Sequence, residues 1–366
     1  MHQSTREGAR ARSLAARCAL SFAGSAPYTE AMVRTMSGIQ PTGNLHIGNY
    51  LGALVNFVEL QKQYEAFFCV VDLHALTRAS ADDWKPEQLA VNVREVAIGM
   101  LASGVDPERA TLFVQSHVPQ HAELAWIMSC LTPLGDLNRM TQFKDKSEDR
   151  PELVNAGLFT YPVLQTADIL LYRAEKVPVG EDQDQHLELA RETVRRFNFR
   201  FGPTLPEPMT VRSKATRVIG LDGQKKMSKS LNNEVGLFET AEETMQKLRS
   251  AKTDPARLRK TDKGTPEVCN MFAWHGFFST PEQCHEVAAG CRSAQLGCVD
   301  CKKLLADNLE RVKGPIRERG AALRSKPAEL DEILAAGAAK ARTTAEQTMV
   351  LVRERIGLRR PAGGGK

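Results

Sequence analysis

Several features are missing from this chain, and each absence excludes a class of protein. No apolar run approaches the ~20 residues that a membrane-spanning helix needs. Neither sign of charge dominates, because 49 basic residues face 44 acidic ones and leave a net charge of +5. That mild basic excess is compatible with a nucleic-acid partner but does not require one. With 42% hydrophobic and 25% charged residues among 366, the composition is that of a globular protein long enough for two domains.

A secretory signal is also missing, because the first 36 residues carry five arginines, two acidic residues and scattered Ala and Ser. This composition resembles an organelle transit peptide. A disordered leader, or sequence upstream of a start at Met32 or Met36, explains it equally. We therefore expect residues 1–32 to be a disordered leader or transit-like extension, and residues 359–366 a disordered tail. The expected location is the cytoplasm, or a mitochondrion or plastid if the leader is a transit peptide.

Apolar segments alternate with stretches of helical spacing through the first two thirds of the chain. This alternation predicts an α/β fold with a doubly wound parallel sheet of Rossmann type over residues 33–235. Strands are expected at 33–37, 67–71, 111–115 and 177–179. Helices are expected at 46–61, 87–103, 120–130, 162–172 and 182–198. Beyond residue 237 helical patterns dominate, most regularly over 328–356, and predict an all-helical second domain over residues 236–358.

The run from Pro41 to Asn49 lies where the first expected strand gives way to a helix. It contains Gly43, Gly48 and His46. Backbone N–H groups and a helix N-terminus are available there to face an anion. The run therefore favours a phosphate-binding turn.

A second run, Lys226-Met227-Ser228-Lys229-Ser230, follows much later. It places two lysines and two hydroxyls on a loop light enough to move onto phosphates. Together, in this order, the two runs indicate an ATP site that activates a carboxylic acid by adenylation.

Three further segments extend the pattern: residues 37–43, 161–170 and 177–183. With the two runs above they resemble bacterial-type tryptophanyl-tRNA synthetases, which are class I aminoacyl-tRNA synthetases. The resemblance is strong from residue 36 to residue 230 and weaker beyond. It implies a tryptophan–tRNA ligase that uses ATP with Mg²⁺, binds L-tryptophan and tRNA(Trp), forms a homodimer and has no membrane association. It also implies that the helical domain binds the tRNA anticodon.

In this family no protein nucleophile is needed, because the tryptophan carboxylate attacks the α-phosphate of ATP. The acyl group then passes to the 3′ end of the tRNA, and AMP and pyrophosphate are released. Positioning and charge neutralisation supply the catalysis. A non-synthetase nucleotidyltransferase and an inactive RNA-binding paralogue are the readings from other functional classes.

The resemblance also implies which residues act. His46, Lys226 and Lys229 would contact the transferring phosphates, with Lys146 as a third positive charge. The ATP pocket would be lined by Gln40, Pro41, Thr42, Gly48, Asn49, Gly180, Glu181, Asp182, Val218, Lys226, Met227, Ser228, Lys229 and Ser230. Plainer readings exist: a helix-capping histidine at 46, acidic residues in a helix first turn at 181–182, a solvated charge run at 226–229 and a polar loop at 144–150.

Asp168 is the candidate for amino-acid specificity. It lies in an apolar helical stretch, where a carboxylate is costly unless it is paired. As an acceptor for the indole N–H it would reject a ring without that donor by ~10⁴ or more. Its charge could instead be satisfied by nearby backbone or by Arg173. Tyr161 and Gln165 precede it on nearly the same helix face and would line the pocket or belong to the core.

The same Tyr161–Gln165–Asp168 spacing is also how tyrosyl-tRNA synthetases hold a phenol, so a tyrosyl enzyme remains the alternative. The segments at 37–43 and 177–183 favour tryptophan. One departure concerns the second run, where the family usually continues with Asp-Pro. Here Leu231-Asn232-Asn233 follows, and this change puts only the hinge behaviour of the loop in doubt.

Eight cysteines without a secretory signal indicate a reducing compartment, in which disulfides are rare. Four of them, Cys269, Cys291, Cys298 and Cys301, have spacings that suit a Cys₄ site for Zn²⁺ or a [4Fe–4S] cluster. Some bacterial tryptophanyl enzymes have a similar late cysteine set. Thiols that merely share a helix face are the alternative.

Overall fold

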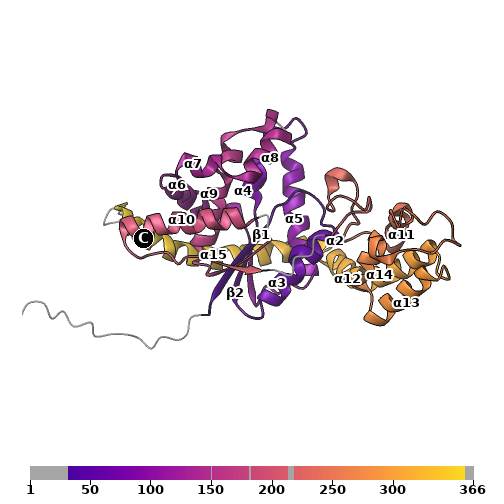
Figure 1. Cartoon of the computed structure of the whole chain (residues 1–366). Helices are drawn as coiled ribbons and strands as arrows, with labels where there is room; N and C mark the ends of the chain where they lie inside the picture. The colour runs from indigo at the N-terminus through magenta and orange to yellow at the C-terminus, as the bar shows by residue number, and fades with distance from the viewer. Residues whose placement is uncertain (1–31, 150, 181–182, 213–217, 359–366) are drawn as a thin grey trace, which may run out of the picture. The chain divides into compact units, whose positions relative to one another are not determined.

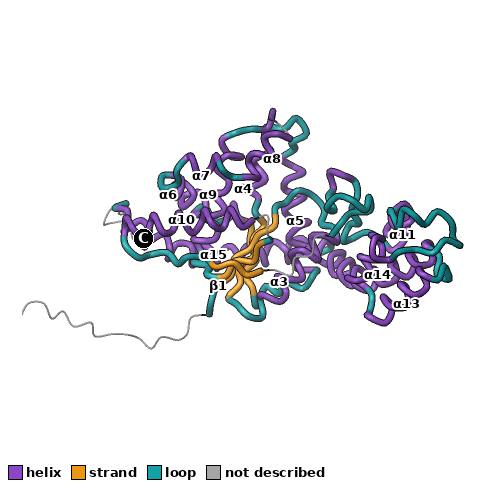
Figure 2. Tube along the Cα trace, in the orientation of Figure 1, coloured by secondary structure: helices purple, strands orange, loops and turns teal. Residues whose placement is uncertain are grey.

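The sheet has five strands, all parallel, in the order β3-β2-β1-β4-β5. The structure is a computed structural model that describes residues 32–149, 151–180, 183–212 and 218–358. Figure 2 shows the strands gathered in one sheet with helices around it. The strands are β1 (Arg34–Ile39), β2 (Glu65–Val70), β3 (Ala110–Val114), β4 (Lys176–Val179) and β5 (Met209–Arg212).

Four of these strands confirm the sequence prediction within a few residues. Strand β5 was not predicted, because it is short, partly exposed and preceded by Pro206 and Pro208. The chain builds the sheet outward from β1 to β3, then returns to place β4 on the other side of β1. The topological switch point therefore lies between β1 and β4, where ligands bind at the carboxyl ends of strands in folds of this kind.

Two apolar cores cover the two faces of the sheet because side chains along a strand alternate in direction. In β2, Phe67 and Cys69 pack into the first core and Phe68 and Val70 into the second. The first core includes α6 (Gln120–Ser129), α9 (Ala156–Leu171) and α10 (Asp184–Phe201); the second includes α3 (Val55–Leu60) and α5 (Pro86–Ala102). Strands β2 and β3 are buried almost throughout, which explains their continuous apolar sequence.

Helix α9 begins earlier than the residue spacing predicted. The side chain of Asn155 accepts a hydrogen bond from Leu158 N at 2.9 Å and caps the helix. Pro162, taken as the start, lies inside the helix. The alternative interpretation of residues 144–150 as a polar loop is wrong, because α8 (Thr141–Asp149) occupies most of this segment.

Shorter helical segments connect these elements. They are α2 (Ile47–Asn49), the π-helical η1 (Tyr50–Leu54), α4 (Asp72–Ala75), η2 (Leu76–Arg78), η3 (Gln115–His117), α7 (Leu134–Asn138), η4 (Pro151–Leu153), η6 (Lys229–Leu231) and η7 (Pro266–Val268). Segments α2, η1 and α3 follow one another and make up the helix predicted at 46–61.

Helices dominate after residue 237, as predicted: α11 (Ala241–Ser250), α12 (Asn270–Phe278), α13 (Pro281–Arg292), α14 (Cys298–Arg324) and α15 (Pro327–Ile356) (Figure 1). Capping boxes start α11 at Thr240 and α13 at Thr280. A third core joins this part of the chain to the second sequence run, because Met227 packs in the same cluster as Trp274 and Leu305.

The last helix, α15, packs back on the sheet. Its alanines 338, 341 and 345 belong to the first core together with β1 and β2. A Cβ atom at Gly337 would overlap the carbonyl oxygen of Leu112 in β3, so only glycine permits this approach. The stripe of small residues therefore lets a helix from the end of the chain lie against β3, an edge strand of the sheet.

Candidate active site

The predicted phosphate-binding turn follows the carboxyl end of β1. Gly43 has a φ of +115°, a conformation that favours glycine. His46 caps α2: its Nδ1 accepts from Asn49 N at 3.3 Å, and its own N–H donates to Asn49 Oδ1 at 3.1 Å. A Cβ at Gly48 would lie 2.9 Å from His46 Nδ1, so the glycine leaves room for the ring. The capping reading of His46 is therefore correct.

The second run folds directly onto this turn. Met227 N donates to Val218 O at 2.9 Å, and the buried Met227 sulfur lies 3.4 Å from the position that a Cβ on Gly48 would take. Lys229 Nζ lies 3.1 Å from the corresponding position on Gly43. The two runs, which are far apart in the sequence, are thus in contact: side chains of the second run lie against glycines of the first. The adenylation hypothesis requires such a contact.

Backbone pairing holds the runs together from the other side. Ile47 N donates to Val235 O at 3.0 Å, and Leu237 N donates to Leu45 O at 2.8 Å. His46 and Gly236 form an isolated antiparallel bridge between these bonds. We call the run Lys226–Ser230 the signature run and the loop that carries it the signature loop. The junction at residues 45–47 and 235–237 therefore anchors the base of the signature loop.

The charges at this junction suit an anionic ligand. Burial, with the nearby Lys229, lowers the pKa of His46 to about 4, although Glu234 opposes the shift. Burial also lowers the pKa of Lys229 to about 8, again against Glu234. At neutral pH the imidazole is therefore neutral and most of the lysine is charged. Desolvated cations of this kind interact strongly with phosphate.

Other residues of the predicted ATP pocket lie around the switch point. Gln40, Pro41 and Thr42 follow β1, Gly180 follows the neighbouring strand β4, and Val218 is buried beneath the loop. Gln40 Nε2 donates to His74 O at 2.9 Å. Glu181 and Asp182 lie outside the described residues, as does the side chain of Lys146.

Asp168 lies in α9 with 4% of its surface exposed, and three side chains donate to it. His74 Nε2 lies 2.8 Å from Oδ2, while His121 Nδ1 and Gln115 Nε2 lie 2.6 and 2.7 Å from Oδ1. The far nitrogen of His121 is 2.8 Å from the Tyr172 hydroxyl and forms a hydrogen bond with it. Asp168 is therefore held by side chains from the ends of β2 and β3 and from α6.

These donors decide the charge of Asp168. Burial alone would raise its pKa, but the hydrogen bonds from His121 and His74 outweigh burial and hold the pKa well below the usual range. Arg173, the partner considered from the sequence, instead donates to Thr204 O at 2.7 Å. Sequence reasoning missed His74, Gln115 and His121; the signal was that polar residues directly follow two buried strands.

Tyr161 and Gln165 lie on the same side of α9, as their spacing predicted. The Tyr161 ring is edge-on to His74, with 6.2 Å between centroids, and its hydroxyl donates to Gln142 Oε1 at 3.1 Å. Gln165 Nε2 donates to Gln183 Oε1 at 3.3 Å. Because His74 contacts Gln40, Asp168 and Tyr161, the two halves of the predicted site are contiguous.

Known proteins resemble this chain over most of its length. It matches the family model of class I tRNA synthetases (W and Y) over residues 29–312. It is 50% identical to the tryptophan–tRNA ligase of Deinococcus radiodurans over 329 residues, which cover 89% of this chain and 99% of that protein. The chain belongs to this family. The resemblance inferred from the sequence is confirmed.

Two further relatives agree. The synthetase is 45% identical to the tryptophan–tRNA ligase of Synechocystis sp. over 339 residues, covering 90% of this chain and 98% of that one. A crystal structure of tryptophanyl-tRNA synthetase from Campylobacter jejuni, complexed with ADP and tryptophan, matches with a TM-score of 0.80 and 35% identity. That match covers 89% of this chain and 100% of the other. In the part of the synthetase that the structure describes, no helix is long and apolar enough to span a membrane.

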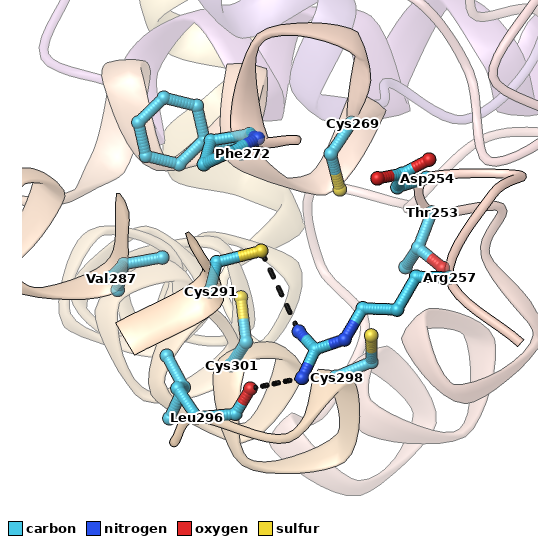
Figure 3. A pocket seen from close by; sticks show the side chains of 11 residues that line it. Thr253, Asp254, Arg257, Cys269, Phe272, Val287, Cys291, Leu296, Cys298 and Cys301 are labelled. Atoms are coloured by element: carbon cyan, nitrogen blue, oxygen red, sulfur yellow. Dashed lines mark hydrogen bonds between the residues drawn. The ribbon is translucent and has the colours of Figure 1, made fainter. Parts of the chain in front are cut away.

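The four late cysteines of this synthetase line one cavity of about 20 Å³ (Figure 3). They come from the start of α12, the end of α13 and the first turn of α14. Arg257 Nη1 donates to Cys291 Sγ at 3.5 Å, and Nη2 donates to Leu296 O at 2.9 Å. Burial, then the other three thiols, raises the pKa of Cys301 to about 12.

The predicted gathering of these cysteines is thus confirmed, but a formed metal site is not. Among the described residues, no group of three or more His, Cys, Asp or Glu side chains is arranged to hold a metal ion. The zinc or cluster itself stays a prediction.

Proposed function

We propose that this synthetase is a tryptophan–tRNA ligase. It activates L-tryptophan with MgATP to tryptophanyl-adenylate, passes the acyl group to the 3′ end of tRNA(Trp), and releases AMP and pyrophosphate. The contact of Lys229 with Gly43 at the switch point carries the proposal. His74 links the end of β1 to the indole pocket, because it forms hydrogen bonds with Gln40 and Asp168. The names of the relatives support tryptophan over tyrosine.

Lys226 and Lys229 bind the phosphates and neutralise the charge that moves to pyrophosphate as the tryptophan carboxylate attacks. Gly43 and Gly48 let the nucleotide approach the backbone, and the neutral His46 orients the turn. Gln40, Pro41, Thr42, Asn49, Gly180, Glu181, Asp182, Val218, Met227, Ser228 and Ser230 complete the nucleotide pocket, and Lys146 adds positive charge. Mg²⁺ enters with ATP and shares the neutralisation of the phosphates.

Asp168 accepts the indole N–H. A carboxylate offers about four lone-pair positions, and three are filled by His74, His121 and Gln115. One position therefore remains for a ligand, and its direction is set by the three donors. Tyr161 and Gln165 line the pocket for the indole ring.

Tryptophan-dependent exchange of labelled pyrophosphate into ATP tests this function. We expect exchange with tryptophan, none with tyrosine or phenylalanine, and charging of tRNA(Trp). Exchange with tyrosine alone would identify a tyrosyl enzyme. Exchange-competent protein that charges no tRNA would indicate a nucleotidyltransferase instead.

We further propose that Cys269, Cys291, Cys298 and Cys301 hold a [4Fe–4S] cluster. Four thiols around one cavity match the ligand set of such a cluster. A single Zn²⁺ on the same four thiolates is the alternative occupant. The buried Arg257 adds a cation, and its Nε has no partner among the described residues.

Iron, sulfide and zinc analysis of anaerobically purified protein tests the cluster. We expect iron and sulfide together with visible absorption, all lost in Cys298→Ser, while Cys130→Ser, an exposed thiol in the sheet domain, leaves them unchanged. Zinc without sulfide would establish the alternative site. Protein free of both metals would exclude any metal role for these cysteines.

The homodimer is a third part of the proposal. Trp126 and Leu76 are 71% and 47% exposed and line a hollow of about 330 Å³ between α6, α9 and η2. A two-fold interface is self-complementary, so a protruding tryptophan beside an apolar hollow suits it. We expect sedimentation to give a dimer and Trp126→Glu to give a monomer; an unchanged dimer would place the interface elsewhere.

The helical part of residues 236–358 is proposed to bind the tRNA anticodon, and the cytoplasm is the proposed location. Tryptophan charging of a tRNA with an altered anticodon should fall while pyrophosphate exchange is unchanged. Equal charging of both tRNAs would exclude anticodon recognition.

A further inference from the structure

Leu231 and Asn232 replace the usual Asp-Pro after the run Lys226–Ser230, and the residue that follows them, Asn233, has a definite place in the structure. Asn233 is 3% exposed, and its carboxamide is used at both ends. Oδ1 accepts from Ser228 N at 2.7 Å, inside the signature run, and Nδ2 donates to Asp222 Oδ2 at 2.6 Å, before it. One side chain thus joins the entrance of the loop to its middle.

Asp222 is itself fixed by the turn that enters the loop. Its Oδ1 accepts from Gln224 N at 2.9 Å and from Lys225 N at 3.0 Å. The bond from Gln224 is the largest influence that lowers the pKa of Asp222, and the bond from Asn233 adds to it against burial. The carboxylate therefore stays ionised and presents Oδ2 to Asn233.

The backbone around this pair leaves Asn233 little freedom. Leu221 N donates to Asn233 O at 2.8 Å. A Cβ at Gly220 would overlap the Asn233 carboxamide, so the glycine makes room for it. Asn232 has a φ of +48°, the left-handed conformation that asparagine tolerates, and this turn brings Asn233 back under the loop.

The segment just before Asp222 is held by hydrogen bonds from α12. Asn270 Nδ2 donates to Gly220 O at 2.7 Å, and Trp274 Nε1 donates to Ile219 O at 2.9 Å. Trp274 is fully buried. The segment that carries Asp222 is thus held by the helical part of the molecule, and the signature run is held to that segment by Asn233.

We propose that the Asn233–Asp222 pair is a latch that positions Lys229 over the phosphate-binding turn. Ser228 is the residue before Lys229, so fixing its N–H fixes the direction in which the Lys229 side chain leaves the loop. Asn233 is a positioning residue, since its contacts are to Ser228, Asp222 and Lys226 O. The inference rests on the proposed phosphate role of Lys229.

Loop opening gives a test that needs no substrate. In Asn233→Ala we expect trypsin to cut after Lys226 or Lys229 several-fold faster than in the wild type, because Ser228 N loses its hydrogen-bond acceptor and the loop opens more often. We expect kcat for pyrophosphate exchange to fall by about 10- to 100-fold through misplacement of Lys229, with the KM for tryptophan unchanged. Asn232→Gly, a change at the neighbouring exposed asparagine that suits its positive φ, should behave as wild type.

A swap of the two side chains separates the latch from a general loss of structure. Asp222→Asn alone sets two amide donors against each other, and Asn233→Asp alone sets two carboxylates against each other. The double variant lets residue 222 donate to residue 233 and keeps an acceptor for Ser228 N. We expect both single variants to lose activity and loop protection, and the double variant to recover most of both.

Three results would overturn the latch: wild-type trypsin resistance in Asn233→Ala, wild-type kcat in that variant, or a double variant no better than its parents. If Asn233→Ala does not fold, the swap set decides alone. An absence of tryptophan-dependent exchange in the wild type, with faster cleavage of Asn233→Ala, would reject the proposed function and leave the latch standing.

Discussion

The two ends of the candidate active site are built on opposite principles. At the phosphate end, Lys226 and Lys229 lie on a partly exposed loop that is held by backbone pairing and by the Asn233 carboxamide. At the indole end, Asp168 is buried and receives three side-chain hydrogen bonds of 2.6 to 2.8 Å. Charge is left for a ligand at one end and is satisfied within the protein at the other.

This difference follows from what each end recognises. Phosphate charge moves during the reaction, so its partners act most when they meet the transition state. A neutral indole offers one donor, so discrimination depends on an acceptor whose direction is fixed beforehand. A movable loop suits the first task, and a rigid network suits the second.

The largest effect is expected from Asp168→Ala. Removal of the carboxylate leaves three buried donors without their acceptor, which should cost about 3–5 kcal/mol of unfolding free energy and abolish exchange. Chemical denaturation and exchange assays measure the two losses. Asp168→Asn is the matched control of the same shape and should retain more stability. A stable Asp168→Ala with only a raised tryptophan KM would show that the network is not structural.

Lys229→Ala should have the reverse signature. Loss of one preorganised cation should lower the exchange kcat by about 100-fold or more, while the melting temperature stays close to that of the wild type, because the ammonium group stabilises a ligand rather than the fold. Pyrophosphate exchange and thermal unfolding on one preparation decide it. Unaffected exchange, or a large loss of stability, would break the contrast between the two ends.

Gly48→Ala probes the meeting of the two runs with a smaller effect. The added methyl would lie 2.9 Å from His46 Nδ1 and 3.4 Å from the Met227 sulfur. One of them must shift, so we expect exchange to fall by about 10- to 100-fold, chiefly through the KM for ATP. Gly52→Ala, where a Cβ meets nothing within 4 Å, is the control. Equal kinetics for both variants would contradict the proposed contact.

The smallest effect is a pH dependence of the phosphate end. Lys229 has a pKa of about 8, below its usual value, so its charge is present below pH 8 and is lost above it. The kcat/KM for ATP should therefore fall above about pH 8, by at most tenfold per pH unit. His46, with a pKa of about 4, stays neutral throughout.

Lys229→Arg provides the control, because a guanidinium keeps its charge over this range. The fall above pH 8 should disappear in that variant, whatever its absolute rate. A fall of the same size in Lys229→Arg would assign the titration to another group.

Local sequence was enough to determine the repeating parts of this protein. Apolar runs such as Phe67–Val71 predicted the strands, and residue spacing predicted the helices, because both depend on neighbours along the chain. The two glycine- and lysine-containing runs, with the segments at 161–170 and 177–183, were enough for the family, since they carry the chemistry of adenylation.

Only the tertiary structure determined which residues form hydrogen bonds and close contacts with one another. The histidines and glutamine that hold Asp168 come from three separate elements, and no local spacing connects them. The return of α15 to β3 depends on Gly337 meeting a carbonyl from the other end of the fold. Asn233 follows the two residues that depart from the motif, and its side-chain amide joins Ser228 to Asp222. Hydrogen bonds and close contacts of this kind are made across space, so their partners become visible only when the chain has folded.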